Sequence, residues 1–252
     1  MKNLILIFVS FFLILPSVAN AQRKIRSGFI VTIGGDTLRG EIRSRNWRLT
    51  PIEIQFRKNP SEDFAFYDTS SIVYFRACED SYIKANVLRD LSPLDYASDI
   101  ERLHSVSAPF VRQSLFLKCL ISGNLFDLLE LKDFERTNYY LREATGKIIY
   151  LSYRIDRNNS GNILKYFYFR ETLRTINANY SNDPVIEAAI NTAEYDANSL
   201  SRIVTKLNQV PSANTENLNS NTTHQSQQKN ACLLLNRNNP AHCFFSGYGK
   251  DG

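Results

Sequence analysis

The sequence is poor in the residues and motifs from which a recognisable catalytic centre is usually assembled. It holds three histidines, one methionine and one tryptophan in 252 residues, and its four cysteines include no C-x-x-C pair. A zinc ribbon or a thioredoxin-type redox motif is therefore not indicated. G-x-S-x-G, H-E-x-x-H and the nucleotide-binding P-loop are absent as well, so the common hydrolase, zinc protease and P-loop signatures are all missing.

Long apolar runs are also scarce, and the single example lies at the start of the chain. Residues 4–15 are apolar at every position but one, and Lys2 precedes them. At 1.5 Å per residue this stretch is far shorter than a hydrocarbon core of ~30 Å. Ala19-Asn20-Ala21 offers the small-x-small pattern that a signal peptidase accepts. Residues 1–21 are therefore predicted to be a cleavable signal peptide.

Charge of one sign is not in large excess, which bears on the partners to be expected. Lys2 is the one charged residue among the first 21, so the remainder carries a formal +4, one less than the +5 of the whole chain. This mild charge favours an anionic envelope component, or another envelope protein, and does not indicate nucleic acid. We expect an exported protein that is periplasmic, associated with the outer membrane or secreted, with no transmembrane segment in the mature chain.

The cysteines agree with export but leave their pairing open. An oxidising compartment permits disulfides, and four cysteines allow three pairings. Cys119 lies in an apolar strand pattern typical of a buried thiol, whereas Cys232 and Cys243 are close enough in sequence for a local loop disulfide. The fourth cysteine is Cys78.

Short alternating apolar segments separated by turn residues dominate the first part of the chain. Phe29, Val31 and Ile33 alternate before the turn cluster at 34–36, which predicts a β-hairpin over residues 28–42. The stretch 112–153 repeats this pattern with turns at Gly123 and Gly146. Residues 22–156 are therefore predicted to form an antiparallel β domain, either a sandwich or a partial barrel.

The apolar period changes toward helical spacing in the region 157–210. Asp183-Pro184 is typical of a helix start, and residues 200, 203, 204 and 207 follow the i, i+3, i+4, i+7 rule. We predict a helical segment over 157–210 that packs on the β domain, giving an α+β fold. Residues 211–252 form a polar tail rich in Asn, Ser, Thr and Gln, which is predicted to be disordered.

Several of these segments together resemble a family of exported bacterial proteins to which no activity is assigned. The resemblance rests on Gly28 to Thr32, the turn from Gly35 to Gly40, Leu115-Phe116-Leu117 with Gly123-Asn124-Leu125 after it, and the segment 200–208. It covers roughly residues 27–209 and involves turns and strand starts. It therefore implies a β domain followed by a short helical segment, and it implies no reaction.

A basic stripe is the first candidate binding site. Arg39, Arg43 and Arg45 share one face of the predicted second hairpin strand, and Trp47 and Arg48 follow. Arginines beside an aromatic ring can hold lipid phosphate or an acidic glycan. The alternative is a solvated outer face without a ligand.

A second candidate is a weak calcium loop. Asp156, Asn158 and Ser160 stand at positions 1, 3 and 5 of an EF-hand-like pattern, but position 12 is Phe167 where a glutamate is needed. A plain turn between a strand and a helix is the alternative interpretation. No cofactor is expected.

The overall interpretation is a non-catalytic exported cell-envelope or interaction protein, with its ligand open. The alternative is an exported hydrolase with an unrecognised site. That site would use His104, or carboxylates from the cluster Asp127, Glu130, Asp133 and Glu135.

Overall fold

A computed structural model describes residues 24–44, 47–92, 110–134, 136–158, 160 and 162–209. Within these residues twelve strands precede three helices, which confirms the predicted α+β class. The predicted signal peptide at 1–21 and the predicted tail at 211–252 lie outside the described residues, as do Arg45, His104 and Glu135.

Ten strands form a single antiparallel sheet whose order is β10-β9-β8-β7-β6-β5-β1-β2-β3-β4. The hairpin predicted at 28–42 is β1 and β2, with Gly28 opposite Gly40 and Gly35 in the left-handed conformation (φ 91°) that its turn requires. The strands of the sheet are β1 (Lys24–Thr32), β2 (Thr37–Ser44), β3 (Glu53–Arg57), β4 (Ala65–Asp68), β5 (Ile72–Ala77), β6 (Asp80–Asp90), β7 (Phe110–Ile121), β8 (Phe126–Lys132), β9 (Thr137–Glu143) and β10 (Ile148–Leu151).

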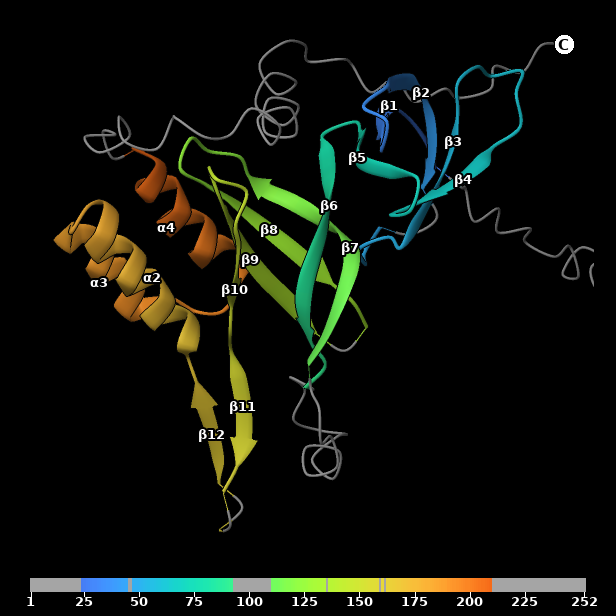
Figure 1. Ribbon diagram of the computed structural model, residues 1–252. Coiled ribbons are helices and arrows are strands. Elements are labelled where there is room, and N and C mark those ends of the chain that lie inside the picture. Colours follow the sequence, from blue (N-terminus) through green and yellow to red (C-terminus); the bar gives the residue numbers. More distant parts are fainter. Residues whose placement is uncertain are drawn as a thin grey trace, which may run out of the picture.

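The sheet curls into a half-barrel (Figure 1). Apolar side chains are buried on both of its faces. Ile30, Ile42 and Phe75 belong to a core formed by side chains from strands between β1 and β7. Leu117 and Tyr140 belong to a second core, formed by side chains of β1 and β5–β9, against which β10 packs. Of the two predicted forms, sandwich and partial barrel, the partial barrel is the one observed. The strand period is confirmed in β7, where Leu117 is buried while Lys118 faces the other side and pairs with Asp80.

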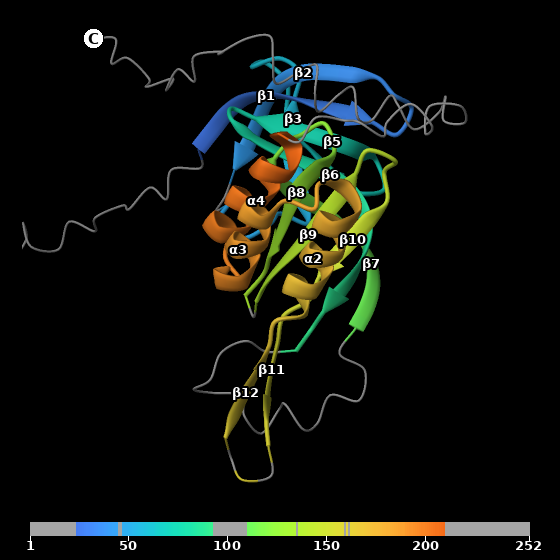
Figure 2. The same ribbon diagram turned by 90° about the vertical axis from the view of Figure 1, so that its left-hand side faces the viewer.

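Three helices cover one face of β8, β9 and β10, as Figures 1 and 2 show. They are α2 (Tyr168–Tyr180), α3 (Pro184–Thr192) and α4 (Ala197–Gln209). The predicted start of α3 is confirmed, because Asp183 accepts a hydrogen bond from the N–H of Val185 and Pro184 opens the helix. The apolar stripe predicted for α4 is buried against the sheet. None of the described helices is long and apolar enough to cross a membrane.

The helical segment does not begin at residue 157 as predicted. Strands β11 (Arg154–Arg157) and β12 (Ile163–Tyr166) form a separate two-stranded hairpin that projects below the sheet in Figure 1. The side chains of Ile163 and Leu164 are exposed there, so this stretch has no buried stripe of the kind that stabilises a surface helix. The helices start only at Tyr168, after which apolar side chains reach the sheet.

Candidate ligand pocket and the predicted binding residues

The structure places Arg39 and Arg43 on one face of β2, as the basic stripe predicts, and separates them from Trp47. The guanidinium of Arg43 lies 3.9 Å from the ring centroid of Phe64, and that of Arg39 lies 5.9 Å from Phe29. Trp47 instead packs edge-on against Phe75 and Tyr82 in the core on the opposite face. Arg48 is exposed in the turn after β2, and Arg45 lies outside the described residues.

Acidic side chains share this face of β2–β4 and reduce its positive charge. Arg57 on β3 makes a salt bridge of 2.6 Å with Glu41 of β2 and also stacks over Phe64. Glu53 of β3 lies opposite Asp68 of the next strand, β4. The arginines therefore serve contacts within the sheet, and the face carries no concentrated positive charge.

The predicted calcium loop lies at the tip of the β11–β12 hairpin. Its position 1, Asp156, is part of β11, and the side chain of Asp156 is outside the described part. Asn158 Oδ1 accepts hydrogen bonds from the backbone N–H groups of Ser160 and Asn162, at 3.1 and 2.8 Å. The oxygen predicted as a calcium ligand thus closes the hairpin turn, and the calcium site stays a prediction.

The carboxylates considered for hydrolysis are held apart by different arginines. Asp127 on β8 accepts from Arg142 Nε at 2.8 Å, and Asp133, just beyond the other end of β8, is bound by Arg89 at 2.9 Å. Across the described ranges, no three His, Cys, Asp or Glu side chains come together as they would around a metal ion. His104 and Glu135 belong to the undescribed residues, so the hydrolase hypothesis stays untested at those positions.

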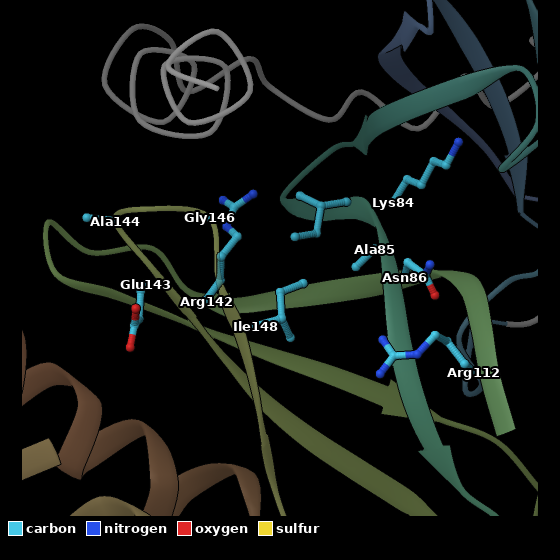
Figure 3. A pocket seen from close by; sticks show the side chains of 10 residues that line it. Lys84, Ala85, Asn86, Arg112, Arg142, Glu143, Ala144, Gly146 and Ile148 are labelled. Carbon is cyan, nitrogen blue, oxygen red and sulfur yellow. The ribbon is translucent and has the colours of Figure 1, made fainter. Parts of the chain in front are cut away.

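A cavity of about 400 Å³ lies at the seam where β6 faces the turn between β9 and β10. This is within the range of roughly 300–1,000 Å³ typical of small-molecule sites. Its lining, shown in Figure 3, is Ile83, Lys84, Ala85, Asn86, Arg112, Arg142, Glu143, Ala144, Gly146 and Ile148. We call this cavity the seam pocket.

Two cations on the β6–β7 side give the seam pocket a net positive charge. Neither Lys84 nor Arg112 has an acidic partner among the residues that the structure describes. Arg142, on the other side, is neutralised by Asp127. Glu143 is the one acid among the described residues of the lining, and in Figure 3 its side chain points away from the other lining groups. The pocket is therefore suited to an anionic group.

The floor of the seam pocket is apolar. Ile83 and Ala85 are buried, and both pack in the core that Ile148 borders. Lys84 and Asn86 alternate with them along β6, so this strand brings an apolar side and a polar side to the same cavity. A ligand with both an anionic and an apolar part would satisfy both sides.

A buried polar cluster fixes the opposite end of the seam. Asp90 at the end of β6 is fully buried, lies 3.2 Å from Arg136 Nη1, and accepts from the hydroxyl of Tyr150 at 3.2 Å. Burial raises the pKa of Tyr150 and so keeps its hydroxyl protonated as a donor. Asn138 adds a hydrogen bond to the backbone carbonyl of Asp90. These contacts tie β6 to β9 and β10 and hold the seam pocket in shape.

Comparison of the chain with protein families, with curated proteins and with solved structures finds no match. Sequence reasoning missed the seam pocket because its two sides lie about 60 positions apart, at residues 83–86 and 142–148. The alternation of polar and apolar residues over 83–87 was the local sign of a strand with one polar and one apolar face. It did not show which other strand would lie across from this segment.

Proposed function

We propose that this protein is an exported, non-catalytic binding protein of the cell envelope, and that the seam pocket receives an anionic group of its ligand. The observation that carries the proposal is the pair of cations, Lys84 and Arg112, which lack acidic partners among the described residues and line a cavity with an apolar floor. A surface salt bridge would have neutralised them, as Glu41 does for Arg57.

The proposed location is supported by the sequence and by one cysteine. Residues 1–21 have the order of a signal peptide, with a basic start, an apolar run and a small-x-small site. Cys78, in the turn between β5 and β6, is disulfide-bonded, and disulfides persist mainly in oxidising compartments. The resemblance to exported bacterial proteins agrees with both points.

Binding rather than catalysis is supported by the types of residue that line the pocket. Catalysis needs a nucleophile or metal, a positioned base and a group that stabilises developing charge. The seam pocket offers cations and an amide that can stabilise an anion, but its lining, as far as the described residues go, contains no histidine, cysteine, serine or tyrosine. Of the described lining residues Glu143 is the one possible base, and in Figure 3 it points away from the cations.

The test uses 8-anilinonaphthalene-1-sulfonate, a fluorescent anion with an apolar ring system. We expect saturable binding to the purified protein and a loss of roughly tenfold or more in affinity for Lys84→Gln/Arg112→Gln. The matched control is Lys58→Gln/Lys206→Gln, which removes the same charge from exposed positions elsewhere. Equal affinity of the pocket variant and the control, with both melting like the wild type, would overturn the proposal.

A further inference from the structure

The edge of β6 that borders the seam pocket is open. From Lys84 to Asp90, β6 pairs with β7 on one side, whereas its pairing with β5 ends at Ile83. Among the described residues no other strand takes the place of β5 along this stretch. Across the seam stands β10, which ends the sheet and, within the part of the chain that the structure describes, pairs with β9 alone. Two strand edges thus face the same cavity.

The directions of these two strands decide what could lie between them. Three strands separate β6 from β10, and every neighbouring pair is antiparallel, so β6 and β10 run the same way around the half-barrel. An additional strand in the seam can therefore be antiparallel to both neighbours. Such a strand would continue the up-and-down order of the sheet, which direct pairing of β6 with β10 would break.

The backbone groups available to an added strand can be assigned from one hydrogen bond. The hydroxyl of Tyr140, on β9, donates to the backbone carbonyl of Leu88 at 3.1 Å, so this carbonyl faces the seam. Backbone groups of a strand point to alternate edges, and the register with β7 is continuous over this stretch. The N–H and C=O groups of Lys84 and Asn86 therefore face the seam as well.

The side chains around this edge specify the sequence of the added strand. Arg112 lies opposite Leu88 on β7, so it shares the outer face with Lys84 and Asn86, whereas Ile83 and Ala85 face inward. A strand laid along β6 would direct alternate side chains to these two faces. Acidic residues on the outer face would meet the two cations, and apolar residues on the inner face would cover the apolar floor.

We infer that the seam pocket binds an extended segment of a partner protein, with alternating acidic and apolar residues, as an added strand on the Lys84–Asn86 edge of β6. This inference rests on the proposed function and names its ligand class. Strand addition to an exposed edge is an established mode of peptide recognition in which main-chain hydrogen bonds provide affinity and side-chain pockets provide specificity. At the end of β6, the contact between Asp90 and Tyr150 closes the seam. The added strand is therefore limited to the part of β6 that lines the seam pocket.

The test compares a short peptide of alternating glutamate and valine with two N-methylated forms, each blocked at one set of alternate amides. Calorimetry should show binding of the parent peptide and a loss of roughly tenfold or more for at least one methylated form. A peptide of the same composition with all glutamates before all valines should bind as weakly as the weaker methylated form. In the protein, Asn86→Pro removes one N–H that faces the seam and leaves the hydrogen bonds with β7 intact. It should therefore weaken binding of the parent peptide by a similar factor.

The sulfonate probe separates this inference from the proposed function. If the probe binds through Lys84 and Arg112 while the parent peptide does not bind, or while both methylated forms bind as tightly as the parent, the pocket holds anions but strand addition is wrong. If neither probe nor peptide depends on the two cations, both proposals fail. Should Asn86→Pro prove unfolded, the methylated peptides still decide the question with the wild-type protein.

Discussion

Asn208, in the last turn of α4, binds the backbone of Phe126 on β8 through both ends of its amide. Its Oδ1 accepts from the N–H of Phe126 at 2.9 Å, and its Nδ2 donates to the carbonyl of the same residue at 2.8 Å. One side chain thereby imitates a strand neighbour for β8. The contact also joins β8 to a helix residue that lies 82 positions further along the chain.

Replacing Asn208 should destabilise the protein well beyond the usual cost of a surface change. Its Oδ1 also accepts from the N–H of Leu125 at 3.0 Å, so Asn208→Ala leaves two half-buried N–H groups without an acceptor. We expect a loss of roughly 2–4 kcal/mol in the free energy of unfolding, measured with urea. Asn198→Ala, an exposed change at the start of the same helix, should stay within about 0.5 kcal/mol. Equal effects of the two would show that the amide contributes nothing.

Gly123 is required by the same contact. A Cβ at this position would lie 2.1 Å from Asn208 Nδ2, so Gly123→Ala must displace the Asn208 side chain. We therefore expect Gly123→Ala to be destabilising in the wild type and nearly neutral in an Asn208→Ala background. A double-mutant cycle by urea unfolding measures this coupling. Additive effects would mean that the glycine serves another purpose.

The Asp90 cluster should be sensitive to the loss of one charge and tolerant of the loss of both. The side chains of Asp90 and Arg136 are fully buried, so Asp90→Ala leaves a buried guanidinium without its carboxylate. We expect a cost of roughly 3–5 kcal/mol, and a smaller one when Arg136→Met is added. Asp36→Ala in the exposed β1–β2 turn is the control. A double variant as unstable as the sum of its parts would argue against a charge-pair explanation.

Local sequence patterns predicted much of the fold, and their limits have physical causes. The buried stripe of α4 and the Asp183-Pro184 start depend on residues within a few positions of one another, so periodicity and capping rules could find them. The Ile163–Tyr166 strand was missed because two apolar residues in a short run fit either period. The placement of β5 beside β1 depends on long-range pairing, which no local pattern encodes.

The candidate site was predicted less well for related reasons. Arg39 and Arg43 share a face as expected, because both lie within the regular part of β2. Trp47 departs from that face since β2 ends at Ser44, and the period of two no longer applies beyond it. Lys84 and Arg112 become a site only through the curl of the sheet, which brings β10 to β6.

The cysteines give a prediction that also bears on export. Cys78 is disulfide-bonded, whereas Cys119 keeps its thiol, which donates to the carbonyl of Ile121 at 3.4 Å. Peptide mapping of exported protein without reduction should therefore join Cys78 to Cys232 or Cys243, both outside the described residues, and should show Cys119 alkylated after unfolding. A disulfide between Cys232 and Cys243, with Cys78 reduced, would contradict this pairing.

Tyr195 should contribute to stability up to alkaline pH and then lose its effect. Its hydroxyl donates to the carbonyl of Leu151 at 2.7 Å and accepts from the N–H of Tyr139 at 3.2 Å, so it ties the chain before α4 to β9 and β10. Burial raises the pKa of Tyr195 to about 12, because the phenolate would lose its hydration.

A folded-state pKa above the unfolded value of about 10 means that folding favours the neutral phenol. The stabilisation by Tyr195 is then complete below about pH 10 and is lost as the pH rises through 12. Near neutral pH, Tyr195→Phe should lower the free energy of unfolding by roughly 1–3 kcal/mol, because the N–H of Tyr139 loses its acceptor. The variant should therefore unfold at a lower urea concentration than the wild type. The difference between wild type and variant should shrink between pH 10 and 12, even though other buried tyrosines destabilise both proteins there. Urea unfolding across this range measures the difference directly, and a constant gap would show that the hydroxyl of Tyr195 titrates no differently in the folded and unfolded chains.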